Sequence, residues 1–276
     1  MSAEEITLKN ADGLNLYVRQ WGSPASARAL VLLVHGLGEH CQRYGHIAAA
    51  MEARDLCLIG YDQRGHGLSQ GKRGVIGSEA QLMGDIGLLL EYTRQLNPSL
   101  PLFLYGHSLG ALEVLYFVLR NRPELKGVIA TSPPLDTSTL SAAQKTLVKV
   151  LVNFLPNLTV SSGLNVNGLS RDAQVVHAYQ QDPLIHDRVS IRLGSFLQTA
   201  PGYVLTHAGE WSLPLYLAHG SADPICPIAG SRAFARQVSA PDFTFREWQG
   251  LYHETHNEPE QAQVIATVTD WIEAHI

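Results

Sequence analysis

A serine flanked by glycines, in the segment Gly106-His107-Ser108-Leu109-Gly110, carries the clearest chemical signal in this chain. The segment follows an apolar run at residues 102–105 and precedes a helix-like stretch at residues 111–121. A serine at such a strand-to-helix turn is the sequence form of a nucleophile elbow, because the tight turn exposes its hydroxyl. Glycines two positions before and after the serine relieve the crowding of that turn. The segment therefore predicts that Ser108 attacks acyl groups.

A serine hydroxyl is a poor nucleophile at neutral pH, so it needs a base, and the base needs an orienting acid. After such an elbow, the acid and then the histidine follow later in the chain. Asp223 comes just after an expected strand at residues 213–218, and His253 just after another at residues 243–248. Since the carboxyl ends of parallel strands meet at one edge of a sheet, these two residues and Ser108 are expected to form a catalytic triad.

Two other residues compete for the partner roles. His256 lies three positions after His253 and is a second candidate base. Asp136 follows an expected strand at residues 127–131 and is a second candidate acid. Both have the side-chain chemistry that the mechanism requires, so the sequence leaves these alternatives open.

Acyl transfer passes through a tetrahedral intermediate whose negative oxygen must be stabilised by backbone N–H groups. One donor is expected from Leu109, the residue after the nucleophile. The second is expected from the loop after the apolar run at residues 29–34, which reads His35-Gly36-Leu37-Gly38. Leu37 is the natural donor in that loop, because the neighbouring glycines let the backbone approach a substrate closely.

Strands and helices alternate along most of the chain. Strands are expected at residues 29–34, 56–61, 102–105, 127–131, 213–218 and 243–248. Helices are expected at residues 44–53, 79–96, 111–121, 228–239 and 259–275. A hairpin, residues 6–8 and 14–21, is expected before them, with its turn at Asp12-Gly13. Continuous apolar strands are typical of sheets buried on both faces, so the pattern predicts an α/β fold with a mostly parallel central sheet flanked by helices.

The alternation breaks after Pro133-Pro134. Residues 136–210 contain no clear strand, and residues 157–170 are rich in Asn, Ser and Gly. Long insertions in compact domains tend to be functional, so we expect an inserted, mainly helical lid at residues 136–210. The core would then consist of two parts, residues 1–135 and 211–276.

Composition narrows the classes of function. The 276 residues carry a net charge of −5 without a basic block, so no nucleic-acid partner is expected. The acidic N-terminus does not resemble a secretory signal, and no apolar run approaches the length of about 18 residues that spans a bilayer. Three cysteines that cannot all pair fit a cytoplasmic protein. No HExxH or Cys/His spacing occurs, so neither a metal nor another cofactor is expected.

Over nearly its whole length the chain resembles the monoacylglycerol lipases and their lysophospholipase-like relatives in the α/β-hydrolase superfamily. The motifs that carry the resemblance are His35-Gly36-Leu37-Gly38-Glu39-His40 with Arg43-Tyr44, Asp62 with Gly65-His66-Gly67-Leu68-Ser69, Gly106-His107-Ser108-Leu109-Gly110, Leu169-Ser170-Arg171-Asp172, Tyr179-Gln180-Gln181-Asp182-Pro183-Leu184, Gly220-Ser221-Ala222-Asp223, and Tyr252-His253 with His256 and Glu258. The resemblance implies the α/β-hydrolase fold with a lid. It also implies hydrolysis of monoacylglycerols to glycerol and fatty acid through an acyl-enzyme, without a cofactor.

The resemblance further implies residues for the alcohol part of the substrate. In monoacylglycerol lipases a glutamate and an arginine of the first loop, and a second histidine after the base, help to hold glycerol. The matching residues here are Glu39, Arg43 and His256, with Tyr179 in the lid as a further candidate. A glycerol head has two free hydroxyls, which need donors and acceptors in a buried site. An ion pair between Glu39 and Arg43 that only braces the loop is the alternative, and both roles can coexist.

Other interpretations of the function stay open. A lysophospholipase or general carboxylesterase would use the same chemistry, and a non-catalytic receptor for a small apolar ligand could use the same fold. Residues 136–165 and the pair His186-Asp187 match no family pattern, so the shape of the lid and the preferred acyl chain stay undetermined. Cys226 is either a thiol near the pocket or a small buried residue, and Cys41 has no assigned role.

The apolar residues of the lid have two interpretations. They pack the lid onto the core, and they also offer a surface for peripheral contact with a membrane or micelle. The residues concerned are Leu147, Val148, Val150, Leu151, Val152, Phe154, Leu155 and Leu158.

Overall fold

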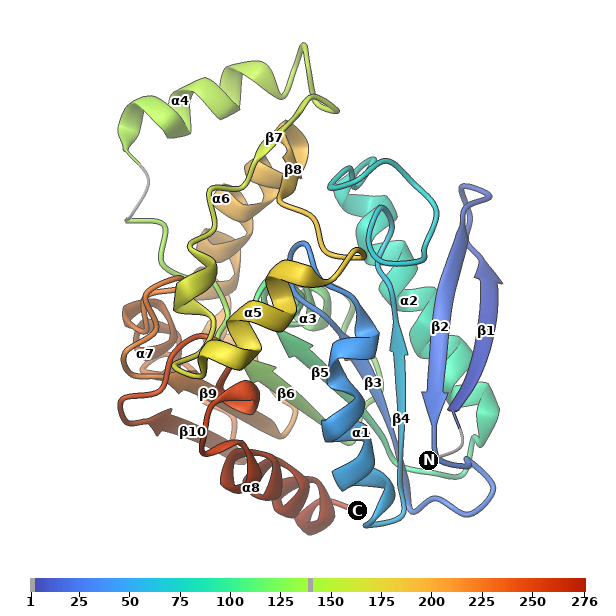
Figure 1. Ribbon diagram of the computed structural model, residues 1–276. Coiled ribbons are helices and arrows are strands. Elements are labelled where there is room, and N and C mark those ends of the chain that lie inside the picture. The colour runs from blue at the N-terminus through green and yellow to red at the C-terminus, as the bar shows by residue number, and fades with distance from the viewer. Residues whose placement is uncertain (1–2, 139–140) are drawn as a thin grey trace.

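Continuous apolar strands form the centre of an eight-stranded sheet in the computed structural model, which describes residues 3–138 and 141–276 (Figure 1). The strand order is β1-β2-β4-β3-β5-β6-β9-β10. Only the pairs β1–β2 and β2–β4 are antiparallel, and the other neighbours are parallel. The strands are β1 (Ala3–Lys9), β2 (Asn15–Trp21), β3 (Ala29–Val34), β4 (Leu56–Tyr61), β5 (Leu102–His107), β6 (Gly127–Thr131), β9 (Leu215–Gly220) and β10 (Phe243–Trp248).

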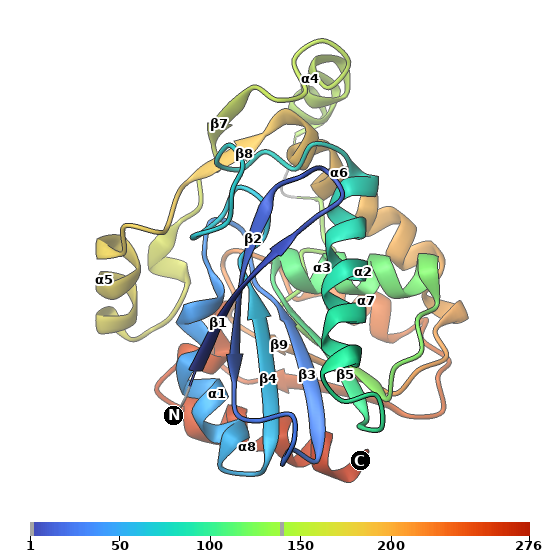
Figure 2. The ribbon, with the colours of Figure 1, turned by 90° about the vertical axis from the view of Figure 1, so that its right-hand side faces the viewer.

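Helices cover both faces of this sheet, as Figure 2 shows from the side. One face carries α1 (Gly45–Glu52) and α8 (Gln261–Ala274), and the other carries α2 (Glu79–Leu96), α3 (Leu109–Asn121) and α7 (Ala229–Ala235). Because both sides of the central strands are covered, the buried apolar side chains form two separate cores, one on each side of the sheet. Burial of this apolar surface is the main favourable term in the stability of such a layered fold.

Between β6 and β9 the chain leaves the sheet and forms a mainly helical segment, as expected. Its elements are α4 (Ala142–Leu151), β7 (Thr159–Ser161), α5 (Ala173–Gln181), β8 (Arg188–Ser190) and α6 (Ile191–Thr206). The expectation of no strand in this segment was wrong, because β7 and β8 pair as a small antiparallel sheet. Two strands of three residues are too short to show a side-chain period, and Pro201 inside α6 conceals its helical pattern.

No helix in the two described ranges is both long enough and apolar enough to cross a bilayer.

The core contains one carboxyl group without a partner. Glu113 lies on α3 and is completely buried, and neither of its carboxyl oxygens accepts or donates a hydrogen bond among the described residues. Burial raises the pKa of Glu113 well above its usual range, and the nearby charge of Asp85 adds to the effect. Because an unpaired buried carboxylate is strongly disfavoured, we infer that Glu113 is protonated in the folded protein.

The Glu113→Gln variant is expected to change how stability depends on pH. Glu113 keeps its proton in the folded protein, whereas the unfolded chain loses it above about pH 4.5. The free energy of unfolding of the wild type therefore falls as pH rises, by up to about 1.4 kcal/mol for each pH unit, until the raised pKa of Glu113 is reached. Glutamine carries no such proton. Thermal unfolding of both proteins between about pH 5 and pH 9 should therefore show the variant gaining relative stability toward alkaline pH. Exposed Glu91→Gln is the control, and parallel curves for wild type and Glu113→Gln would contradict the assignment.

Candidate active site

Ser108 occupies a strained turn between β5 and α3. Its backbone has φ 53° and ψ −122°, in a region that residues other than glycine rarely adopt. A side chain at Gly106 would collide with the backbone of Gly110, and one at Gly110 would collide with the carbonyl oxygen of Val34. The turn is held in place because the Ser108 N–H donates to the Thr131 carbonyl on β6 at 2.9 Å. This local geometry is the elbow that the sequence predicts.

The structure brings Ser108, His253 and Asp223 together in one chain of hydrogen bonds. The Ser108 hydroxyl donates to Nε2 of His253 at 2.8 Å, and Nδ1 of His253 donates to Oδ2 of Asp223 at 2.7 Å. Asp223 follows β9 and His253 follows β10, and these strands are parallel neighbours. The arrangement can therefore deliver a proton from the serine to the histidine, with the histidine tautomer set by the aspartate.

The electrostatics of this group favour a negative Asp223 beside a basic His253. Although burial opposes ionisation, the charge of His253 and hydrogen bonds from His219 and His253 hold the pKa of Asp223 well below its usual range. Its Oδ1 also accepts the N–H groups of Ile225 and Cys226, at 2.8 and 2.9 Å. Burial alone would lower the pKa of His253, but Asp223 raises it well above its usual value. A negative Asp223 at this position therefore favours the charged form of the His253 ring.

Neither competing residue joins this group. The His256 ring stacks on Tyr44, with centroids 5.1 Å apart, and lies outside the cavity lining. The Oδ1 atom of Asp136 accepts the N–H of Ser138 at 2.7 Å. In the described part of the chain, neither side chain is hydrogen-bonded to Ser108 or His253. The geometry therefore favours His253 as the base and Asp223 as the acid.

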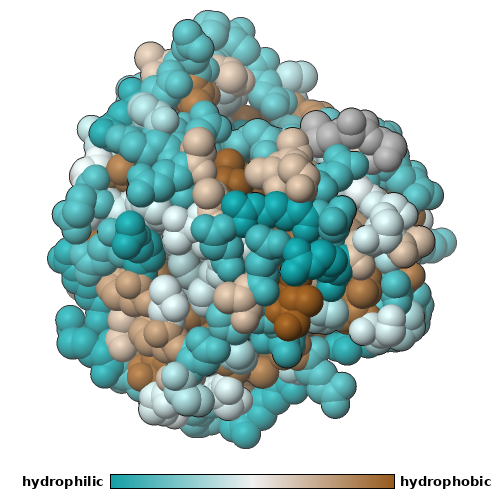
Figure 3. Space-filling model, turned by 90° about the horizontal axis from the view of Figure 1, so that it is seen from below, coloured by the Kyte–Doolittle hydropathy of each residue, from teal (hydrophilic) through white to brown (hydrophobic). Residues whose placement is uncertain are grey.

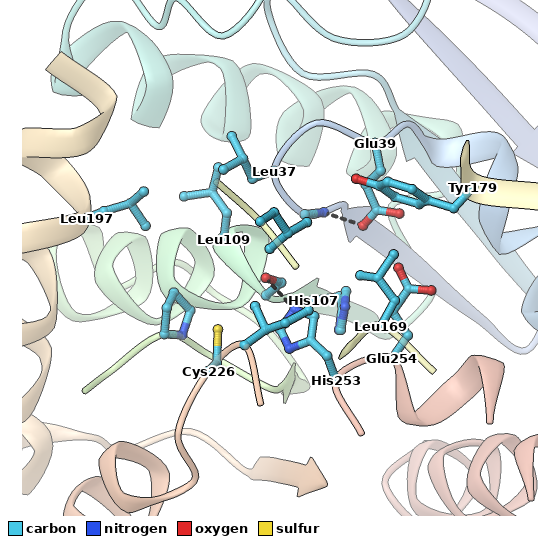
Figure 4. A pocket seen from close by; sticks show the side chains of 15 residues that line it. Leu37, Glu39, His107, Leu109, Leu169, Tyr179, Leu197, Cys226, His253 and Glu254 are labelled. Atoms are coloured by element: carbon cyan, nitrogen blue, oxygen red, sulfur yellow. Dashed lines mark hydrogen bonds between the residues drawn. The ribbon is translucent and has the colours of Figure 1, made fainter. Parts of the chain in front are cut away.

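A cavity of about 150 Å³ lies over Ser108 and has two chemically different ends (Figure 4). Glu39, Tyr179 and Glu254 gather at one end, and Leu197 lies at the other. Leu37 and Leu109 line the cavity between them. The N–H of Leu109 is the first of α3 and has no intrahelical acceptor, as the first amides of every helix do not. Both predicted oxyanion donors therefore lie at the nucleophile, and their role stays a prediction.

Arg43 is clamped between two glutamates at the polar end. Its guanidinium contacts Oε2 of Glu39 at 2.5 Å and forms a two-pronged pair with Glu254, with both N–O distances at 2.7 Å. Oε1 of Glu39 accepts the Tyr44 hydroxyl at 2.8 Å and the Gly36 N–H at 2.7 Å. The ion pair between Glu39 and Arg43 that the sequence left as an alternative is thus present, and it braces the loop.

The four residues predicted for the alcohol part do not all reach the cavity. Glu39 and Tyr179 line it, whereas Arg43 and His256 lie behind its wall. The Arg43 guanidinium stacks over the Tyr179 ring, 4.8 Å from its centroid, and so links the insertion to the core. Arg43 therefore positions Glu39, Glu254 and Tyr179, whereas His256 packs on Tyr44.

Glu254 is a charged residue of the cavity that sequence reasoning missed. Its position directly after His253 was the available signal, since the residue next to a base is close to the reacting atoms. Although burial opposes ionisation, the Arg43 guanidinium holds the pKa of Glu254 below its usual range. Burial lowers the pKa of His256 to about 3, so this ring is neutral at physiological pH. Two carboxylates facing one guanidinium leave the polar end with one net negative charge.

The cysteines of the site differ in their position. Cys226 lines the cavity, and burial raises the pKa of its thiol, so it is a neutral thiol beside the triad. Cys41 is fully buried, and its backbone N–H donates to Oδ1 of Asp62 at 2.8 Å. Asp62 also accepts the Leu68 N–H at 2.7 Å, and it thereby ties the loop after β4 to the segment that follows the candidate oxyanion loop.

Comparison with known proteins supplies relatives for this site. The family model described as serine aminopeptidase, S33, matches residues 25–260. The monoacylglycerol lipase of Mycolicibacterium smegmatis is 32% identical over 281 residues, which cover 99% of this chain and 98% of that protein. An uncharacterized abhydrolase domain-containing protein of Dictyostelium discoideum is 30% identical over 100% of this chain, which spans only 30% of that longer protein.

A solved structure has the same fold as this chain. The monoacylglycerol lipase of Paleococcus ferrophilus is 34% identical and superimposes with a TM-score of 0.87, covering 95% of this chain and 99% of that one. The predicted α/β-hydrolase fold and the resemblance to monoacylglycerol lipases are confirmed by this similarity.

Proposed function

We propose that this chain, which belongs to the serine aminopeptidase S33 family of α/β-hydrolases, cleaves monoacylglycerols to glycerol and free fatty acid. It is a serine hydrolase related to monoacylglycerol lipases. The observation that carries the proposal is the polar end of the cavity. Glu39, Tyr179 and Glu254 supply acceptors and a donor for the two free hydroxyls of a glycerol head, beside the candidate nucleophile. The apolar end suits an acyl chain.

The first half of the reaction forms the acyl-enzyme. His253 takes the proton from the Ser108 hydroxyl while the serine oxygen attacks the ester carbonyl. The N–H groups of Leu37 and Leu109 stabilise the negative oxygen of the tetrahedral intermediate. His253 then gives its proton to the glycerol oxygen as the ester C–O bond breaks, and glycerol leaves the polar end.

The second half releases the fatty acid. A water molecule enters the position that glycerol has left, and His253 takes one of its protons as the water oxygen attacks the acyl carbon. The same two N–H groups stabilise the second intermediate. Its collapse breaks the bond to Ser108, which recovers its proton from His253, and the enzyme returns to its starting state.

The net charge of the polar end favours a neutral alcohol over a phosphate. Glu39 and Glu254 already engage the guanidinium of Arg43, so no free cation faces the cavity from this cluster. A phosphate on the glycerol would lie near one uncompensated negative charge. At a separation of about 6 Å and an effective dielectric of about 20, the repulsion amounts to about 3 kcal/mol. This charge supports a monoacylglycerol rather than a lysophospholipid as substrate.

A substrate panel tests the proposal. We expect kcat/KM for 1-oleoylglycerol to exceed that for its 3-phosphate by about 100-fold, and the Glu254→Gln variant to bring this ratio close to one, because the variant removes the one uncompensated negative charge. The measurement is fatty-acid release under identical detergent conditions. Exposed Glu260→Gln is the control and should keep the wild-type ratio. Equal rates on the neutral and phosphorylated substrates would contradict the proposal and favour a lysophospholipase.

We also propose that the end of the molecule formed by α4 and the chain that follows it contacts the lipid surface. Large apolar side chains are exposed there, and the most exposed is Phe154, at 77%. The others are Leu147, Val150, Leu155, Leu158 and Val160. The opposite end of the molecule is mostly hydrophilic, with hydrophobic side chains only in scattered patches (Figure 3). Such a cluster supports peripheral contact with a membrane or micelle.

The double variant Phe154→Asp/Leu155→Asp is expected to separate surface binding from chemistry. Two charges in the exposed apolar cluster oppose insertion into a lipid surface, so we expect hydrolysis of vesicle-borne 1-oleoylglycerol to fall by about tenfold or more. Hydrolysis of water-soluble p-nitrophenyl acetate should not change. Ile276→Asp, which alters an apolar side chain 40% exposed at the other end of the chain, is the matched control. An equal loss on both substrates would count against lipid contact here.

A further inference from the structure

The loop that contains Leu37 is fixed from the core side by a histidine in a defined tautomer. The Gln63 N–H donates to Nε2 of His35 at 2.9 Å, so Nε2 is an acceptor and the proton resides on Nδ1. Nδ1 then donates to the Gly36 carbonyl at 2.7 Å. Because a peptide group is planar, holding this carbonyl directs the N–H of Leu37 to the opposite side. Residues of the core thus fix the orientation of the peptide group that carries the Leu37 N–H, the candidate oxyanion donor.

The inserted segment holds the same loop from outside. The backbone N–H of His186 donates to the Gly38 carbonyl at 2.9 Å. Gly38 has φ +77°, and a side chain there would collide with the carbonyl oxygen of His186, so the two backbones are in direct contact. One turn earlier in the insertion, Asp182 accepts a hydrogen bond from Nε2 of His40 at 2.8 Å. The turn at residues 182–186 is therefore seated on residues 38–40 at both of its ends.

The side chain of His186 connects that turn to the core. The Arg188 N–H donates to its Nδ1 at 3.1 Å, so Nε2 carries the proton and donates to the Gly65 carbonyl, also at 3.1 Å. Its ring lies 4.6 Å from the His66 ring, and His66 in turn lies 5.3 Å from His35. His186 thus contacts the candidate oxyanion loop through its backbone and the loop after β4 through its ring.

We propose that His186 is a positioning residue for the oxyanion hole, through which the inserted segment holds the Leu37 N–H in its working direction. The inference rests on the proposed attack by Ser108. When the turn at residues 182–186 is seated, the Gly38 carbonyl has its donor and the loop is held from both sides. When the ring of His186 loses its bonds, the turn keeps only its backbone bond to Gly38 and the bond between His40 and Asp182, so it holds the loop less firmly and the Leu37 N–H moves out of line with the oxygen that it stabilises. Such a loss acts on the transition state more than on the bound substrate.

His186→Ala tests this inference with an ester that lacks glycerol. Complete removal of one oxyanion donor costs about 100- to 1,000-fold in kcat, so misalignment of a donor should cost about tenfold. We expect kcat for p-nitrophenyl butyrate to fall about tenfold with KM unchanged. An alkyl trifluoromethyl ketone, which adds to Ser108 and forms an oxyanion, should bind more weakly by the same factor. The affinity for a fatty alcohol, which forms no oxyanion, should not change.

Further variants separate positioning from a general structural effect. His186→Gln can donate again to the Gly65 carbonyl and should recover part of the kcat. His177→Gln alters an exposed histidine on α5 of the same insertion and should behave as wild type. If His186→Ala does not fold, His186→Asn keeps an acceptor for the Arg188 N–H and takes its place in the same assays.

Two results would overturn the inference. One is a rise in KM alone. The other is a fall in kcat with no change in the affinity for the ketone. Because p-nitrophenyl butyrate contains no glycerol, either result leaves the proposed substrate class untouched. Failure of the wild type to hydrolyse any ester would instead contradict the proposed function.

Discussion

The Ser108→Ala variant is expected to lose about 10⁶-fold in kcat for the hydrolysis of 1-oleoylglycerol while it keeps its fold. The serine oxygen forms the bond to the acyl group, so without it the remaining groups can only promote direct attack by water. Alanine keeps the Cβ atom, so the strained turn at φ 53° is no more strained than in the wild type. Fatty-acid release gives kcat, and thermal unfolding reports on the fold.

A nearby serine provides the matched control for this variant. Ser132 is also buried with a positive φ, of 51°, and its hydroxyl donates to the backbone carbonyl of His253 at 2.8 Å. Its hydroxyl bonds to the backbone of His253 and not to the ring, so Ser132→Ala should retain activity within about tenfold of the wild type. If Ser108→Ala kept activity comparable to that of Ser132→Ala, another residue would be the nucleophile.

The Asp223→Asn variant is expected to lower kcat by about 10⁴-fold. An amide at this position can donate to Nδ1 of His253, which places the ring proton on Nε2. Nε2 then cannot accept the proton of Ser108, although the residues stay in place. Asp136→Asn alters the other acid that the sequence allowed, and it should leave kcat unchanged. The reverse outcome would assign the acid role to Asp136.

The pH profile of this variant gives a second measurement. Only neutral His253 can act as the base, so activity rises as pH rises through its pKa. The Asp223 charge raises the pKa of His253, so the acid limb of kcat/KM in the wild type should lie above the usual histidine value of about 6.5. In the Asp223→Asn variant, loss of that charge should move the acid limb of the remaining activity to lower pH. A limb at the same pH in both proteins would contradict the coupling between Asp223 and His253.

The sheet and the residues at its edge could be predicted from the sequence because their signals are local. Apolar runs such as β3, with every residue buried, indicate strands covered on both faces. Ser108, Asp223 and His253 could be grouped without a structure because each follows an expected strand, although the strand before His253, β10, is an edge strand that is mostly half-buried. Parallel strands bring these ends together, so the chain order of the three residues was enough to expect their contact.

The polar end could not be predicted in the same way, because it depends on contacts between distant segments. Arg43 and Glu254 are 211 positions apart, and no periodicity connects them. For the same reason the sequence did not show that Arg43 and His256 lie behind the cavity wall. Element ends were also imprecise, since the helix expected at residues 228–239 spans only Ala229–Ala235.

The α4 region was hidden for a different reason. It has no buried side chain, so its residues were not constrained to show an apolar stripe facing the core. Its apolar side chains are largely exposed instead, and the signal that could have located the helix, the capping box of Ser141 and Gln144 at its start, was missed.

The most direct test of the proposed mechanism is to trap the acyl-enzyme that forms from 1-oleoylglycerol. Protein mixed with 1-oleoylglycerol and quenched with acid within the first turnover would be digested and its peptides analysed by mass spectrometry. The proposed mechanism predicts an oleoyl group on Ser108, together with free glycerol, and no such group in the Ser108→Ala variant. An oleoyl group on another residue, or free oleate without any acylated Ser108 under conditions where acylation outpaces hydrolysis, would contradict it.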